Sequence, residues 1–139
     1  MRLKEQRLWD RTRANLSRSG LLMERVENVV SEGTPDIHTL HNGLCTWIEL
    51  KAVISVPKRA ETPLLGDKAG LRVAQQNWHA TWHRHGGRSV VLIGVGSYYN
   101  LAVPGALAYG INQANLNALR AAAVAEGWAE IIAYLKGTI

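Results

Sequence analysis

The chain has 139 residues, with 16 Lys and Arg against 11 Asp and Glu, a formal net charge of +5 and a single cysteine. This length suffices for one domain, which we place at residues 1–139, and one cysteine excludes an intramolecular disulfide and a cysteine-rich zinc site. No apolar run is long enough to span a bilayer and the charged amino terminus is no signal peptide, so we expect a cytoplasmic protein without a membrane partner.

The first predicted element is a helix over residues 3–17, one stripe of which is mostly apolar. The stripe consists of Glu5, Leu8, Trp9, Thr12 and Leu16. A carboxylate on an inward-facing stripe is costly unless it is paired, hydrogen-bonded or bound to a metal. Glu5 is therefore a candidate metal ligand, directly or through water. The alternative is that Glu5 pairs with a cation at the helix start, where the helix dipole favours an acid.

A meander of three strands is predicted next. The first strand covers Leu22–Val30 and contains Glu27, the rival of Glu5 as the additional acid. Residues Ile37–Gly43 alternate apolar and polar side chains and end in Asn-Gly, the strongest short-range signal for a tight hairpin. The partner strand, Thr46–Lys51, is rich in apolar residues and is predicted to be internal.

Three charged groups meet at this hairpin. Asp36 opens the second strand, and because alternate side chains of a strand share a face, Glu49 and Lys51 lie beside each other on the third. Carboxylates are the ligands that Mg²⁺ and its substitute Mn²⁺ prefer. Such an ion stabilises charge on phosphate oxygens and lowers the pKa of a bound water, while an ammonium positions the water or the phosphate. The pattern indicates phosphodiester cleavage; the alternative is a turn followed by an exposed pair of charges.

An irregular loop follows over Pro57–Gly70, marked by prolines, glycines and mixed charges. We expect it to lie over a nucleic-acid groove; the alternative is an ordinary surface loop without a binding role. A basic chain favours polyanionic partners, and its clustered cations are candidate phosphate contacts, although each one alone is typical of a solvated surface. The candidates are Arg7, Arg11, Lys58, Arg59, Lys68 and Arg72.

A helix is predicted over Leu71–His85. Trp78 and Trp82 lie on its inward stripe and are expected to be core residues, although tryptophan also stacks on bases in single strands. His79 and His83 have the spacing of a zinc-binding pair. The glutamate that follows the first histidine in metalloproteases is absent, so no zinc site is predicted.

The next segment, Ser89–Gly96, is a continuous apolar run that ends in glycine, typical of a strand buried on both faces in the middle of a sheet. The order helix, three strands, helix, strand predicts an α/β fold with a mixed sheet of about four strands. Residues 97–139 add a short extended piece and an Ala- and Leu-rich helix over Asn115–Lys136, which Gly127 can divide in two. This extension covers the sheet or pairs with a second copy in a homodimer.

Four motifs occur in the order in which the PD-(D/E)XK nucleases carry them. They are Glu5, Gly33-Thr34-Pro35-Asp36, Glu49-Leu50-Lys51 and the Leu-x-x-x-Gln-x-x-Trp pattern of Leu71–Trp78. Over about residues 3–96 the chain resembles this family, and within it the VRR-NUC group and the archaeal and phage Holliday-junction resolvases. The resemblance implies a restriction-endonuclease-like core and metal-dependent hydrolysis of nucleic acid.

The resemblance also implies roles for single residues. Asp36, Glu49 and the backbone carbonyl of Leu50 would hold the metal, and Lys51 would serve the nucleophile. Gln75 matches a glutamine that lies close to the active site in the family. With Glu5, the predicted catalytic residues are therefore Glu5, Asp36, Glu49, Lys51 and Gln75.

Two classes of function follow from these patterns. The first is a Mg²⁺- or Mn²⁺-dependent endonuclease that cuts DNA and selects a junction, flap or branch by its structure, because the sequence contains no base-reading motif. A sequence-specific restriction-type nuclease is a variant of this class. The second is a nucleic-acid-binding module that has kept the fold without the chemistry.

Overall fold

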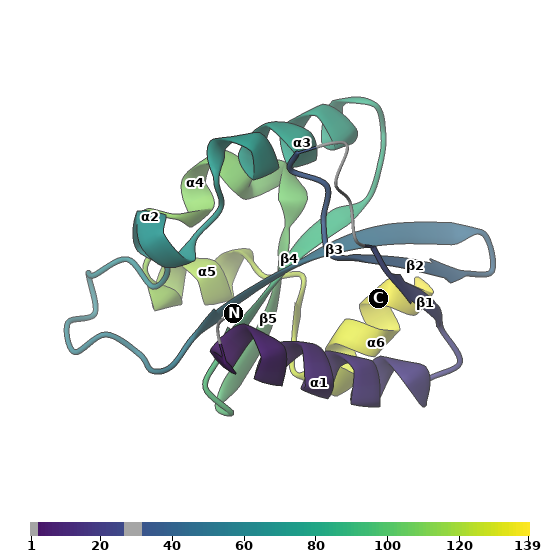
Figure 1. Cartoon of the computed structure of the whole chain (residues 1–139), viewed down its shortest axis with the longest axis horizontal. Coiled ribbons are helices and arrows are strands. Elements are labelled where there is room, and N and C mark those ends of the chain that lie inside the picture. Colours follow the sequence, from purple (N-terminus) through teal and green to yellow (C-terminus); the bar gives the residue numbers. More distant parts are fainter. Residues whose placement is uncertain (1–2, 27–31) are drawn as a thin grey trace.

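The computed structural model describes residues 3–26 and 32–139, and these form a six-stranded sheet with helices on both faces (Figure 1). The strands are β1 (Leu22–Arg25), β2 (Ile37–His41), β3 (Leu44–Val53), β4 (Ser89–Val95), β5 (Tyr99–Pro104) and β6 (Ala125–Glu126). The helices are α1 (Leu3–Ser17), α2 (Gly66–Ala69), α3 (Val73–Arg84), the 3-10 helix η1 (Gly105–Leu107), α4 (Ala108–Ile111), α5 (Leu116–Ala122) and α6 (Trp128–Lys136). Within the described ranges, no helix combines the length and the apolar composition needed to cross a membrane.

The six strands follow one another across the sheet in chain order. β1, β2 and β3 form the predicted antiparallel meander, β3 and β4 are parallel, and β5 and β6 continue antiparallel. A parallel pair needs a crossover connection, and the loop, α2 and α3 between β3 and β4 provide it. All seven residues of β4 are buried, which confirms the prediction of a central strand.

The hairpin between β2 and β3 decides which side chains share a face. Asn42 (φ 50°) and Gly43 (φ 84°) have the positive φ values that its two-residue turn requires. From this turn the strand register extends to the pair of Ile37 and Ile48. The two acids predicted at the hairpin, Asp36 and Glu49, therefore lie one residue beyond the last backbone pair, side by side at the end of β2.

Two hydrophobic cores lie on the two faces of the sheet. α1 and α6 cover one face, whose core includes Leu8, Ile48, Leu50, Leu92 and Leu135. α4 and α5 cover the other face, whose core includes Val91, Ile93, Leu101, Ile111 and Leu119. The alternation along β3 thus buries its leucine and isoleucine under α1 and directs its glutamate and lysine to the opposite face, as the sequence predicted.

The carboxyl-terminal extension differs from the prediction, because it adds two strands to the sheet. The expected extended piece is β5, and Asn115–Lys136 is divided into two helices, as the glycine allowed, but the strand β6 lies between α5 and α6. α5 ends at Ala122, because Ala123 has an extended backbone (φ −62°, ψ 137°), and Gly127 (φ 84°) is the residue that precedes α6. The Ala-rich composition favours helix, but pairing of Ala125 and Glu126 with β5 overrides that local preference. The number of strands predicted was therefore too small.

Three tryptophans form an aromatic cluster where α3 packs on the sheet. Trp78 and Trp82 stack with their ring centroids 5.0 Å apart, and both meet Trp47 of β3 edge-on. The three rings are half-buried and belong to neither hydrophobic core. Trp78 and Trp82 therefore pack against the sheet through Trp47, as expected of inward-facing residues, but they lie outside the two aliphatic cores.

His79 is a fully buried residue of α3, and its Nδ1 lies 2.8 Å from the Ser89 hydroxyl. Burial, and secondarily the positive charge of Lys51, lowers the pKa of His79 from 6.5 to about 4. Between these two pH values the unfolded chain binds more protons than the folded protein, so stability falls as the pH falls from 6.5 to 4. His79 is thus a neutral packing residue at neutral pH.

We expect His79 to contribute a loss of stability of about 3 kcal/mol between pH 7 and pH 4. Urea unfolding of the wild type and of His79→Gln across this range measures it. The variant should lose less stability on acidification than the wild type does. The same pH dependence in both proteins would contradict the assignment.

Candidate active site

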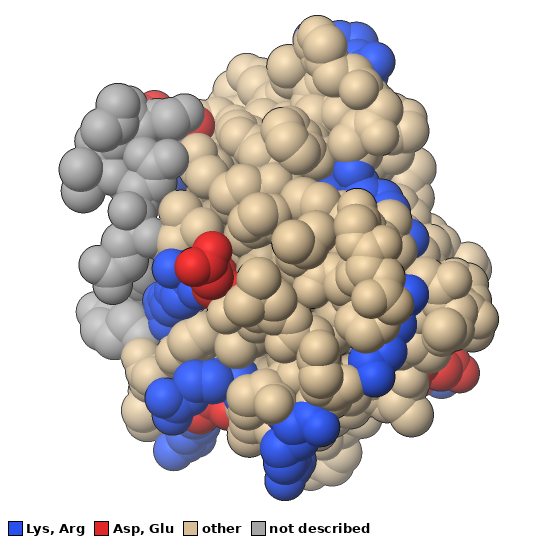
Figure 2. Space-filling view, turned by 90° about the vertical axis from the view of Figure 1, so that its right-hand side faces the viewer, with Lys and Arg blue, Asp and Glu red and all other residues tan. Residues whose placement is uncertain are grey.

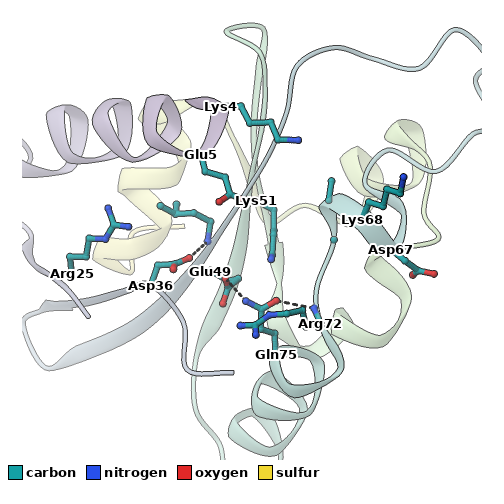
Figure 3. A pocket seen from close by; sticks show the side chains of 13 residues that line it. Lys4, Glu5, Arg25, Asp36, Glu49, Lys51, Asp67, Lys68, Arg72 and Gln75 are labelled. Atoms are coloured by element: carbon teal, nitrogen blue, oxygen red, sulfur yellow. Dashed lines mark hydrogen bonds between the residues drawn. The ribbon is translucent and has the colours of Figure 1, made fainter. Parts of the chain in front are cut away.

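A cavity of about 590 Å³ opens between the start of α1, the end of the β2–β3 hairpin and the segment that leads from α2 into α3 (Figure 3). All five predicted catalytic residues line it, and they come from four separate parts of the chain. They are Glu5, Asp36, Glu49, Lys51 and Gln75. The structure thus brings together residues up to seventy positions apart in sequence.

Asp36 is held at the end of β2 by the edge of β3. Its Oδ2 accepts a hydrogen bond of 2.8 Å from the backbone N–H of Leu50. The ladder between the two strands has already ended at Ile37 and Ile48, so the carboxylate replaces the missing backbone acceptor. The N–H and C=O of one strand residue face the same edge, and the carbonyl of Leu50 therefore also faces the side on which Asp36 lies.

Glu49 is the most deeply buried charged group of the cavity, with 2% of its surface exposed. Its Oε2 accepts a hydrogen bond of 3.0 Å from Gln75 Nε2, whereas its Oε1 has no hydrogen-bond partner in the described part of the chain. Burial raises the pKa of Glu49 well above its usual range, the negative charge of Asp36 raises it further, and Lys51 opposes the shift. A buried carboxylate oxygen without a partner is costly, and a bound cation would satisfy it.

The oxygen atoms at this point fit a divalent cation. Two carboxylates, from Asp36 and Glu49, lie next to the backbone carbonyl of Leu50, and hard cations take oxygen ligands of these kinds. The residues that the structure describes contain no group of three His, Cys, Asp or Glu side chains arranged to hold a metal. The remaining positions of an ion here would fall to water or substrate, as is usual for Mg²⁺.

Lys51 and Gln75 complete the buried part of the cavity. Lys51 is 8% exposed and points into the cavity towards Glu49 (Figure 3). Gln75 is 6% exposed and is held at both ends, because its Oε1 accepts from the Arg72 backbone N–H at 2.9 Å while its Nε2 donates to Glu49. This pairing fixes which way the amide points, so Gln75 presents a donor to the carboxylate.

Gly33 of the Gly-Thr-Pro-Asp motif has a packing role beside α3. A Cβ at this position would lie 2.2 Å from the Ala74 carbonyl oxygen, and the φ of Gly33 is 86°. A side chain is excluded on both counts. The motif begins with glycine because its backbone must pass directly over the first turn of α3 on the way to Asp36.

Glu5 lies in the first turn of α1, is half-buried and points into the cavity (Figure 3). The helix begins and ends at the predicted residues, and Leu8, Thr12 and Leu16 of its stripe are buried. The rival acid, Glu27, lies outside the described residues.

Besides Lys51, four cations line the cavity with the acids. Lys68 and Arg72 line the cavity as expected. Lys4 and Arg25 line it as well. Lys4 directly precedes Glu5 and belongs to the basic cluster that the sequence places on the amino-terminal helix. Arg25 pairs with Ile37 in the β1–β2 register, and nothing local indicates that register.

The other four predicted phosphate contacts lie away from the cavity. Arg11 turns towards the sheet, where its Nη2 donates to the Gly96 carbonyl oxygen at 2.9 Å. Arg7 is exposed on α1. Lys58 and Arg59 line a separate hollow of about 270 Å³ against α5. The loop that was expected to lie over the groove therefore reaches the cavity only at its end, from residue 67 to residue 70, while its first part projects from the molecule (Figure 1).

The basic residues do not form one continuous patch on the face that carries the turn between β2 and β3. Figure 2 shows this face, with Lys and Arg in separate groups mainly along its lower and right margins and with a centre made largely of other residues.

The sheet order and the cavity define an α/β protein with a restriction-endonuclease-like fold, in which two acids and a lysine meet at the end of a hairpin. No protein-family model and no curated protein matches the sequence. Among the solved structures that match is Hjc from Archaeoglobus fulgidus, a Holliday junction resolvase from an archaeal hyperthermophile. The similarity has a TM-score of 0.58 with 18% sequence identity and covers 83% of this chain and 89% of that one. At this identity it shows a shared fold.

Proposed function

We propose that the protein is a divalent-metal-dependent endonuclease that hydrolyses phosphodiester bonds in DNA. One observation carries the proposal: the buried Glu49 carboxylate has an unpartnered oxygen and lies in the same cavity as Asp36 and Lys51. Burying Glu49 beside the half-buried Asp36 is unfavourable without a nearby cation, and the Lys51 ammonium offsets part of this cost but makes no hydrogen bond to Glu49 Oε1. The arrangement is therefore difficult to explain as a structural feature alone.

In this proposal Asp36, Glu49 and the Leu50 carbonyl hold Mg²⁺ or Mn²⁺, with Glu5 contributing directly or through water. The ion supplies charge neutralisation and a more acidic water. Gln75 keeps Glu49 oriented through its hydrogen bond. Lys51 donates to the attacking water or to a phosphate oxygen, and stabilises negative charge that develops there.

The same cavity supports selection of DNA by its structure. Its cations contact phosphates, which position a nucleic acid without reading its sequence. The similarity in fold to a Holliday junction resolvase supports a junction or another branch as the preferred substrate.

The proposal has three further parts: membership of the VRR-NUC group, a homodimeric state and a cytoplasmic location. Light scattering at low protein concentration checks the dimer.

The test is a cleavage assay on plasmid and on branched and linear DNA with Mg²⁺, with Mn²⁺ and with EDTA. We expect the wild type to cut only with a metal and to prefer branched DNA, and Glu49→Ala and Lys51→Ala to be inactive. Activity that survives both substitutions would point to a contaminant. A wild type that binds DNA but never cuts it would favour the non-catalytic binding module.

The positions of the cations give a matched pair of variants with the same net charge. Removing Lys68 and Arg72, which line the cavity, should lower DNA affinity by about tenfold or more and reduce the slope of log affinity against log salt by about 2. Removing Lys58 and Arg59, which lie away from it, should have a smaller effect on both. Fluorescence anisotropy in EDTA at several salt concentrations measures this. Equal losses in the two double alanine variants would contradict the path proposed for the DNA.

A further inference from the structure

Asn112 follows α4 in the carboxyl-terminal extension, outside the residues that carry the sequence resemblance, and it is only 3% exposed. Its Oδ1 accepts a hydrogen bond of 2.7 Å from the Leu71 backbone N–H, and its Nδ2 donates to the Leu71 carbonyl oxygen at 2.9 Å. One side chain thus binds both backbone polar groups of residue 71. A buried amide satisfied in this way holds a segment in one position.

The surrounding contacts hold the same segment. The Gly66 backbone N–H donates to the Asn112 carbonyl oxygen at 3.0 Å, and Asn112 Nδ2 lies 3.4 Å from Asp67 Oδ1. A Cβ on Gly70 would lie 2.0 Å from Asn112 Oδ1, so only glycine permits this close approach. Residues 66–71, of which residues 67–70 line the cavity, are therefore held in place by the extension.

The path from Asn112 continues to the acids. Leu71 is joined by a peptide bond to Arg72, whose backbone N–H donates to Gln75 Oε1. Gln75 Nε2 then donates to Glu49 Oε2 (Figure 3). Asn112 is consequently at one end of a short chain of hydrogen bonds and covalent bonds that ends at the most deeply buried carboxylate of the cavity.

We propose that Asn112 is a positioning residue of the candidate active site, which acts through Leu71, Arg72 and Gln75 to orient Glu49. This inference rests on the proposed function. If residue 71 shifts, Gln75 Oε1 loses the hydrogen bond from the Arg72 backbone N–H. The side-chain amide of Gln75 is then free to rotate, and Glu49 Oε2 loses the hydrogen bond from Gln75 Nε2. Small displacements of catalytic groups have large effects on rate, with about 1 Å costing about a hundredfold. The extension thus serves the site, in addition to covering the sheet.

Asn112→Asp tests the proposal with little change in shape. It keeps the acceptor for the Leu71 N–H, removes the donor to the Leu71 carbonyl and places a charge beside Asp67. We expect kcat to fall by about tenfold or more while KM for DNA changes by less than about threefold. Gln113→Ala is the matched control, because this exposed neighbour donates to Asp67 and not to Leu71; its kcat should stay within about twofold of the wild type.

A double-variant cycle separates positioning from a general structural role. In a Gln75→Ala background the path is already cut, so Asn112→Asp should lower kcat by less than about threefold further. An equal factor in both backgrounds, or an unchanged kcat in the single variant, overturns the proposal while the cleavage activity of the wild type stands. Circular dichroism checks folding, and Asn112→Ser replaces the aspartate variant if that variant does not fold.

A wild type that does not cut any DNA refutes the proposed function, and the inference is then decided by ¹⁵N NMR. Asn112→Asp should shift the side-chain amide resonance of Gln75, whereas Gln113→Ala should leave it in place. A Gln75 resonance that stays unchanged in both variants overturns the inference.

Discussion

Glu49→Gln should abolish cleavage and at the same time stabilise the metal-free protein at neutral pH. The pKa of Glu49 is raised by burial and by the charge of Asp36, so above pH 4.5 the unfolded chain binds fewer protons than the folded protein and stability falls as the pH rises. Glutamine removes the buried charge and keeps a carbonyl oxygen for the bond from Gln75. We expect a gain of about 1–3 kcal/mol, the usual cost of a buried polar atom without a partner.

Urea unfolding in EDTA from pH 5 to pH 8 measures this gain, which should grow with pH. Added Mg²⁺ or Mn²⁺ should stabilise the wild type and not the variant, because a ligand that binds only the folded state shifts the unfolding equilibrium. Glu61→Gln, in the exposed loop, is the control. It should be no more stable than the wild type in EDTA, and added metal should stabilise it as much as the wild type. A Glu49→Gln protein less stable than the wild type at pH 8 would refute this account of the buried carboxylate.

The central part of the site was predictable because it depends on local rules. The Asn-Gly turn sets the register of the hairpin, and the register together with the two-residue period of a strand decides that Glu49 and Lys51 share a face near Asp36. No long-range contact enters this argument. The two acids and the lysine could therefore be placed before any coordinates were known.

The remainder of the site depends on how distant segments meet. Arg25 reaches the cavity through the register of β1, and Asn112 reaches Leu71 across forty-one positions of the chain. A cluster of basic residues in the sequence does not show which way each side chain points. Arg11 was therefore predicted as a phosphate contact, although its side chain turns towards Gly96. Whether these residues reach the cavity is decided by tertiary packing rather than by their spacing in the sequence.

The fold shows the same division. Long periodic elements such as α1 and β4 were found at nearly their observed bounds, because their hydrophobic patterns are strong. The pair Ala125 and Glu126 forms β6 in a segment whose composition favours helix, because β5 offers it backbone partners. A strand of two residues carries no periodic signal.

Lys51→Met should lower kcat by about a hundredfold to ten-thousandfold while the fold is retained. Methionine keeps the apolar stem that β3 buries and removes only the ammonium. DNA affinity in EDTA should fall by less than about tenfold, because the other cations of the cavity remain. Single-turnover cleavage and anisotropy separate the two effects.

The same variant has a readout that does not depend on activity. The charge of Lys51 helps to lower the pKa of His79 to about 4, and it also opposes the raised pKa of Glu49. Removing the ammonium should therefore raise the pKa of His79 in an NMR titration, whereas Lys58→Met, on the exposed loop, should leave it unchanged. If kcat changes by less than about threefold while the His79 pKa rises as expected, the ammonium is near the site but does not serve the reaction.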